Sequence, residues 1–155
     1  MAVEIGTYAG KSSIAIGLGL QGGRLYTVDH FRGNPEHRDP PARDVAWHHL
    51  KAFGLLNVAT ILEGESVIVA ETFRQPVDML YVDGCHEFQA VIDDFAAWWP
   101  HVTAGGHILF HDAYLSDWPG VAAAVSAIAD RWPLVEMGPA GSIRHFRKRI
   151  NGSTQ

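Results

Sequence analysis

The chain has little cysteine, no long apolar run and no excess of basic residues, and each shortage excludes a class of protein. A single cysteine, Cys85, excludes a disulfide within the chain and is typical of a reducing compartment. No apolar run reaches the roughly 20 residues of a membrane span, and Glu4 interrupts any signal-peptide core. The formal net charge of -5 argues against a nucleic-acid surface. We therefore expect a cytoplasmic protein that binds neither a membrane nor nucleic acid.

What the 155 residues do contain is an alternation of β-rich runs and segments of helical period. One helix is predicted from about Glu87 until Pro100 stops it, and another from about Gly120. Seven runs predict strands: Val3 to Ile5, Arg24 to Val28, Val58 to Leu62, Val77 to Val82, His107 to Phe110, Leu134 to Met137 and Ser142 to Phe146.

This order predicts an α/β fold, a Rossmann-like, seven-stranded, mostly parallel sheet with helices on both faces. The turn from Gly138 to Gly141 predicts a C-terminal antiparallel hairpin. We expect one domain over residues 1–150 and a tail over 151–155. Residues 30–44, HFRGNPEHRDPPARD, are too polar and proline-rich to pack, which predicts a lid from Phe31 to Arg43.

Polar residues follow five of the predicted strands, where a parallel sheet binds its ligands. Because all of these strand ends meet at one edge of the sheet, they predict a single site. The residues are Glu4 and Gly6, Asp29, Glu63 to Ser66, Asp83 to His86, and His111 with Asp112.

The first of these strand ends, VEIGTYAGKSS, indicates the kind of ligand. Gly6 and Gly10 are spaced G-x-x-x-G, whereas a dinucleotide fold prefers G-x-G-x-x-G. A carboxylate at Glu4 would repel a pyrophosphate and favour a cation. Asp29 follows Gly10 by nineteen residues, a spacing that suits the ribose hydroxyls of a nucleoside. These residues predict a nucleoside that carries an ammonium group.

The later strand ends indicate the chemistry. An alcohol is a weak nucleophile, so a divalent cation that acidifies it and a base that takes its proton would help it react. Asp83 and Asp112 offer the oxygen ligands that Mg²⁺ prefers, and His86 can accept a proton near neutral pH. The imidazole of His111 favours Mn²⁺, Fe²⁺ or Zn²⁺ instead, so the identity of the metal stays open.

The stretch VEIGTYAGKSS resembles the first motif of class I S-adenosylmethionine-dependent methyltransferases, in the form found in the catechol O-methyltransferase group. The similarity extends through YTVDHF and LEGES to YVDGCHEFQAVIDDFAAWWPHVTAGGHILFHDAY, and so covers residue 3 to about 115. In that last block the chain is more similar to the metal-dependent sugar O-methyltransferases of macrolide biosynthesis.

The resemblance implies a role for each motif. Asp29 would bind the ribose, Gly64 and Ser66 the adenine, and Asp83 would serve the cofactor, the metal and catalysis together. Asp83 and Asp112 would hold Mg²⁺, with His111 standing where those enzymes often have a carboxylate. His86 would be the general base. The methionine part would be lined by Glu4, Gly6, Thr7, Tyr8 and Ser12.

We therefore expect divalent-metal-dependent methylation of a sugar hydroxyl, on a glycoside or a polysaccharide precursor such as a methylated mannoside, with S-adenosylmethionine as donor. One alternative is a non-haem iron oxygenase that uses Asp83, His86 and His111. Others are a phenol or catechol O-methyltransferase and a non-catalytic nucleoside-binding subunit. Enzymes of the resembled group carry helices before the first strand, so we expect either that Met1 is not the native start or that a partner chain closes the site, and we expect a homodimer. Asp93 and Asp94 are expected on the solvated face of their helix, and Cys85 in packing.

Overall fold

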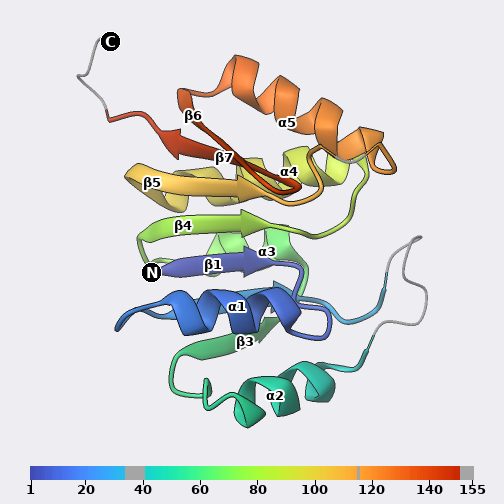
Figure 1. Cartoon of the computed structure of the whole chain (residues 1–155), viewed down its shortest axis with the longest axis vertical. Coiled ribbons are helices and arrows are strands. Elements are labelled where there is room, and N and C mark those ends of the chain that lie inside the picture. The colour runs from blue at the N-terminus through green and yellow to red at the C-terminus, as the bar shows by residue number, and fades with distance from the viewer. Residues whose placement is uncertain (34–40, 115, 151–155) are drawn as a thin grey trace.

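The computed structural model describes residues 1–33, 41–114 and 116–150. Strands and helices alternate along these ranges, as the hydrophobic periodicity predicts (Figure 1). Their bounds are β1 (Ala2–Ile5), α1 (Lys11–Gly19), β2 (Leu25–Asp29), α2 (Arg43–Ala52), β3 (Ala59–Glu63), α3 (Ser66–Thr72), β4 (Val77–Val82), α4 (Phe88–Trp98), the 3₁₀ helix η1 (Trp99–His101), β5 (Val102–Phe110), α5 (Pro119–Arg131), β6 (Leu134–Ala140) and β7 (Ile143–Lys148).

The seven strands form one sheet in the order β3-β2-β1-β4-β5-β7-β6. The first five are parallel, and β7 runs antiparallel to both β5 and β6. The predicted fold is therefore confirmed, including its C-terminal hairpin. Because β1 lies between β2 and β4, the strand order reverses there, and the site is expected at the carboxyl ends around this switch point.

Helices cover opposite faces of the sheet (Figure 1). Apolar residues of α3, α4 and α5 pack with β1, β4 and β5 in one core, and α1 and α2 pack against β2 and β3 in a second. On α4, the buried residues Val91, Phe95 and Trp98 follow helical spacing. Phe88 shares that spacing but is 43% exposed, because the helix begins there, beyond the packed core.

The terminal hairpin is tighter than its sequence predicts. Strand β6 continues through Gly138, with a register shift between Glu136 and Gly138, and Ala140 pairs with Ile143. The turn is therefore two residues long rather than four. Its first residue, Gly141, has a φ of 64°, the left-handed conformation that such turns require.

Two predicted segments lie wholly or partly outside the described residues. These are the tail, 151–155, and the central part of the predicted lid, 34–40. Among the helices of the described ranges, none combines the length and apolar character needed to cross a membrane.

Candidate functional site

A cavity of about 1160 Å³ opens beyond the carboxyl ends of the parallel strands. Small-molecule sites usually measure about 300–1000 Å³, so this one has room for a nucleoside cofactor together with an acceptor. The structure brings most of the predicted site residues to its wall. They are Gly6, Thr7, Tyr8, Ser12, Asp29, Gly64, Ser66, Asp83, His86, His111 and Asp112.

Two glycines with positive φ determine the path of the loop between β1 and α1. Gly6 has a φ of 95°, and a Cβ there would lie 2.0 Å from the carbonyl oxygen of Asp83. Gly10 has a φ of 83° and immediately precedes α1. Only a residue without a side chain lets this loop cross the end of β4 so closely. Gly6 thus shapes the floor of the cavity between β1 and β4, whereas Gly10 lies next to Ala46 of α2.

Glu4 lies beneath this loop and is fully buried. Its carboxyl group accepts hydrogen bonds from the hydroxyls of Ser13 and Thr27. Burial raises the pKa of Glu4 to about 7, although hydrogen bonds from Ser12, Ser13 and Thr27 oppose the shift. Glu4 does not line the cavity, unlike Ser12. Its side chain therefore meets the site through a layer of hydroxyl groups rather than directly.

Asp29 ends β2, and its carboxylate connects the loop after β1 with the loop after β2. One carboxylate oxygen accepts a hydrogen bond from the Tyr8 amide at 2.8 Å, and the other accepts one from the Phe31 amide at 2.7 Å. Each carboxylate oxygen has a second lone pair, so both retain the capacity to accept a ligand hydroxyl. The carboxylate is held in place at the cavity wall, where a ribose can reach it.

The ends of β4 and β5 bring two carboxylates and two imidazoles together. Val82 pairs with Phe110 in the parallel register, so Asp83 and Asp112 follow neighbouring strands. His111 Nδ1 lies 3.0 Å from Asp83 Oδ1 and 3.1 Å from Asp112 Oδ1. A φ of 54° at Asp112, a conformation that Asp tolerates better than most residues, turns the chain at this point.

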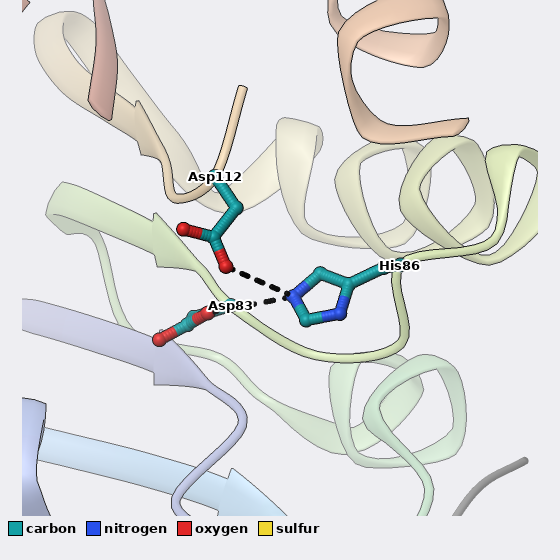
Figure 2. Close-up of side chains that lie close together, drawn as sticks. All are labelled: Asp83, His86 and Asp112. Carbon is teal, nitrogen blue, oxygen red and sulfur yellow. Dashed lines mark ion pairs between the residues drawn. The ribbon is translucent and has the colours of Figure 1, made fainter. Parts of the chain in front are cut away.

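His86 faces the same two carboxylates from the loop before α4 (Figure 2). Its Nε2 lies 3.6 Å from Asp112 Oδ2 and 3.9 Å from Asp83 Oδ1, beyond the range of a strong hydrogen bond. The ring stacks on Trp118, with centroids 4.3 Å apart and planes 29° apart. This stacking fixes the imidazole so that it points at the carboxylate pair.

These neighbours set the charge of the cluster. A hydrogen bond with Asp83 raises the pKa of His111 above its ordinary value. Burial alone would raise the pKa of Asp83, but the neighbouring imidazoles of His111 and His86 outweigh it and hold that pKa low. Tyr81 is buried beside Asp83, Glu4 and Asp112, and its pKa is raised, so its hydroxyl stays protonated. The result is an ionised carboxylate site suited to a cation.

The donor set fits a divalent metal ion. Asp83, His86 and Asp112 offer donor atoms that all lie within 4.8 Å of one another, and His111 adds an imidazole nitrogen between the carboxylates. Carboxylate oxygens suit Mg²⁺ and Mn²⁺, and imidazole adds affinity for Mn²⁺, Fe²⁺ and Zn²⁺. The sequence predicts Asp83, His111 and Asp112 as ligands, and the structure brings His86 to the same point.

Two residues of the cavity wall, Asp94 and Cys85, differ from what the sequence predicts. Asp94 was expected on the solvated face of α4, but it is half-buried and lines the cavity. Burial raises its pKa to about 6. The spacing of Ala90 and Asp94, four residues apart and both in the wall, was the available signal. Cys85, expected in packing, is half-buried and also lines the cavity.

Comparisons with known proteins agree with this geometry. Residues 3–113 match the methyltransferase domain family. The O-methyltransferase NovP superposes with a TM-score of 0.74 at 16% identity, covering 96% of this chain and 72% of that one. TomG of Streptomyces achromogenes, an O-methyltransferase involved in tomaymycin synthesis, superposes in complex with S-adenosylmethionine with a TM-score of 0.73 at 19% identity, covering 96% and 73%.

A calicheamicin-biosynthesis enzyme, a TDP-rhamnose 3'-O-methyltransferase, gives a TM-score of 0.64 at 18% identity, covering 94% of this chain and 70% of that one. A curated relative, an uncharacterized protein of Acanthamoeba polyphaga mimivirus, is 38% identical over 61 residues, which span 39% of this chain and 28% of that protein. The matched domain covers most of the chain, and the fold is that of S-adenosylmethionine-dependent O-methyltransferases. The chain belongs to the methyltransferase domain family.

Proposed function

We propose that this chain transfers the methyl group of S-adenosylmethionine to a sugar hydroxyl, with the help of a divalent cation. The observation that carries the proposal is the convergence of Asp83, His111, Asp112 and His86 at one end of a cavity large enough for cofactor and acceptor. The structural likeness to a TDP-rhamnose 3'-O-methyltransferase supports a sugar as the acceptor.

Asp83 and Asp112 would hold the cation with His111, whose Nδ1 already lies about equally close to an oxygen of each carboxylate. When bound, the cation acidifies and orients the acceptor hydroxyl. His86 then takes the hydroxyl proton on Nε2, which faces Asp112 at 3.6 Å and Asp83 at 3.9 Å. Trp118 holds the imidazole in this orientation.

The cofactor would lie across the switch point. Asp29 would accept hydrogen bonds from the ribose hydroxyls, and the loop from Gly6 to Ser12 would hold the methionine part. The negative charge of Asp83, whose pKa is held low, favours the ammonium and sulfonium groups of S-adenosylmethionine over a pyrophosphate.

A phenol or catechol is a second candidate acceptor. The cavity is lined by Tyr81, Leu109 and Ile143 together with His111. This apolar wall suits an aromatic ring better than it suits a sugar. The iron oxygenase is disfavoured because a second carboxylate, Asp112, lies as close to both imidazoles as Asp83 does.

A transfer assay tests these proposals. Labelled S-adenosylmethionine is incubated with mannosides, deoxysugar glycosides and catechols, with and without Mg²⁺ or Mn²⁺, and the acceptor that gains label is identified. We expect label in a glycoside only when a divalent cation is present. Label in catechols alone would replace the sugar proposal, and full-rate transfer after chelation would exclude the metal mechanism.

We also propose a homodimer. Strand β6 lies at the edge of the sheet, where Val135 and Met137 are 45% and 47% exposed. An open edge with apolar side chains favours pairing with another copy. Sedimentation that finds only a 17 kDa species at high protein concentration would contradict this proposal.

A further inference from the structure

Two histidines and an arginine on β5 and β7 form a group of side chains that the proposed chemistry does not use. His107 Nδ1 lies 2.8 Å from His145 Nε2, so one ring donates a hydrogen bond to the other. Arg147 is a neighbour of both, because it pairs with His107 in the antiparallel register and lies two positions beyond His145. We call His107, His145 and Arg147 the basic cluster.

The basic cluster lies on the sheet face that α4 and α5 do not cover. Ile108 and Phe146, on the same two strands, are buried in the core with these helices. Since successive side chains on a strand point to opposite faces, the cluster points the other way. On that face, α1 lies in front of the sheet beside β1, whereas no helix of the described ranges lies in front of β4 or β5 (Figure 1). His107 and Arg147 are accordingly exposed.

The cofactor cavity extends along this open face toward the basic cluster. Its wall includes Leu109 of β5 and Met79 of β4. Leu109 pairs with His145 and Met79 pairs with His107, so the apolar wall and the basic cluster are adjacent. Leu109 is two residues from His111 along β5, and His107 is four residues from it. At about 3.3 Å per residue, the basic cluster therefore lies roughly 7 to 13 Å along the strands from the proposed metal site.

Few negative charges oppose an anion on this part of the sheet. Strands β4 to β7 contain two acidic residues, Asp78 and Glu136. Asp78 accepts a hydrogen bond from Thr103, and Glu136 forms an ion pair with Arg144. Among the described residues, no carboxylate forms an ion pair with Arg147. An anion at the basic cluster would therefore meet a guanidinium whose charge is not already neutralised.

The acceptor is the part of the proposed reaction complex that can reach the basic cluster. Under the proposed function, on which this inference rests, the reacting hydroxyl faces Asp83 and Asp112. The cofactor occupies the side of Asp29, so the rest of the sugar extends over Leu109 and Tyr81 in the cavity wall. The strand length between the proposed metal site and the basic cluster suits one sugar ring. The group that meets the basic cluster is then the one attached beyond that ring.

We propose that the acceptor carries a phosphate group, as a glycosyl phosphate or a nucleoside diphosphate sugar, and that the basic cluster binds this group. The planar guanidinium of Arg147 contacts two phosphate oxygens at once. His107 and His145 donate from the ring nitrogens that lie outside their shared hydrogen bond. Burial and the neighbouring His107 lower the pKa of His145, so the pair gains an extra proton most readily when an anion lies beside it.

Calorimetric titration with inorganic pyrophosphate tests the phosphate site without methyl transfer. A chelator is present, so that no metal ion links pyrophosphate to the carboxylates. Wild type is expected to bind pyrophosphate saturably, and Arg147→Gln should weaken the affinity roughly tenfold, because one charged hydrogen-bonding partner is lost. His107→Ala should also weaken it, and it replaces Arg147→Gln if that variant fails to fold. Arg131→Gln removes the same charge at the exposed end of α5 and should bind as wild type does.

Methyl transfer to matched acceptors identifies the source of the phosphate. The methyl glycosides, 1-phosphates and nucleoside diphosphate derivatives of mannose and of rhamnose are compared, with Mn²⁺ and saturating S-adenosylmethionine. We expect KM to be roughly tenfold or more lower for a phosphorylated acceptor than for its methyl glycoside, and Arg147→Gln should remove this difference with little change in kcat. Equal KM values for the two phosphorylated forms would identify a glycosyl phosphate, and a lower KM for the nucleotide form would identify a sugar nucleotide.

Failure of the inference differs from failure of the proposed function. If wild type does not bind pyrophosphate, or if Arg147→Gln and His107→Ala bind it as tightly as wild type, the basic cluster is not a phosphate site and the inference is overturned. Methylation of a neutral glycoside in the same experiments would leave the proposed function standing. If pyrophosphate binding depends on Arg147 but no sugar derivative gains a methyl group, the proposed function fails, and the assignment of the acceptor fails with it.

Discussion

Glu4 and Asp83 are both carboxyl groups near the ends of neighbouring parallel strands, yet the structure shifts their pKa values in opposite directions. Glu4 is surrounded by hydroxyls, and burial raises its pKa to about 7. Asp83 has the imidazoles of His111 and His86 beside it, and its pKa is held below the ordinary value despite burial. Hydroxyl groups do not offset desolvation fully, whereas imidazoles that can carry charge do. The same chemical group is therefore a structural, proton-holding group on β1 and an ionised member of the proposed cation site at the end of β4.

Removing a carboxylate from the cation site should have the largest effect. Asp112→Ala is expected to reduce kcat on the order of 10³-fold, because a bound cation contributes several kcal/mol to the transition state. The binding of Mn²⁺, followed by electron paramagnetic resonance, should be lost with activity, while S-adenosylhomocysteine still binds. Unchanged Mn²⁺ binding in this variant would remove Asp112 from the ligand set.

The same assay should distinguish the roles of the two imidazoles of the cluster, those of His86 and His111. His86→Ala is expected to lower kcat on the order of 10²-fold or more and to leave Mn²⁺ affinity nearly intact, since a general base is lost. His111→Ala should weaken Mn²⁺ binding as well. The reverse result, in which His86→Ala loses the metal and His111→Ala keeps it, would exchange the two roles.

Substitution of Glu4 should change the free energy of unfolding of the protein rather than its rate of methyl transfer. Native Glu4 keeps its proton to about pH 7, whereas the unfolded group has a pKa of 4.5. The native state therefore binds more protons in this interval, and the free energy of unfolding falls as pH rises from 4.5 to 7. Glu4→Gln lacks this titration, so its stability relative to wild type should rise by roughly 3 kcal/mol across that window.

Urea unfolding of both proteins at pH 5 and at pH 8 measures the difference. Parallel changes in the two proteins between these pH values would show that Glu4 keeps an ordinary pKa.

The smallest effect is expected at Asp29. Asp29→Asn removes the charge and one acceptor from the ribose site, which should weaken the binding of S-adenosylhomocysteine about tenfold, the equivalent of one charged hydrogen bond. Calorimetry measures the change, and thermal unfolding reports whether the loss of the Tyr8 and Phe31 contacts also loosens the fold. An affinity equal to that of wild type would place the ribose elsewhere.

The sequence was sufficient to predict the sheet because strand and helix periods differ, and because each parallel strand ends at a glycine or an acidic residue or is followed by one within two positions. It was also sufficient to place Asp29, Asp83, His86, His111 and Asp112 in one cavity, since parallel strands end at one edge. Which of the other predicted residues line the cavity depends on their burial in the folded chain. Sequence spacing alone does not distinguish Glu4, beneath the loop, from a residue that lines the cavity.

Asp94 shows the same limit on a helix. An Asp-Asp pair is typical of a solvated face, and Asp93 is indeed exposed. Asp94, one position later, points to the seam between α3 and α4, where Trp98 and Ser66 pack. Which of two adjacent residues is buried depends on the rotation of α4 against α3, and this tertiary packing is not encoded in local composition.

The most direct test of the cofactor site is calorimetric titration of the wild-type chain with S-adenosylmethionine, S-adenosylhomocysteine and NAD, in the presence of Mn²⁺. The geometry of Gly6, Asp29 and Asp83 predicts saturable binding of both sulfur-containing nucleosides and no binding of the dinucleotide. Binding of NAD, with no heat from S-adenosylmethionine or S-adenosylhomocysteine, would contradict the account.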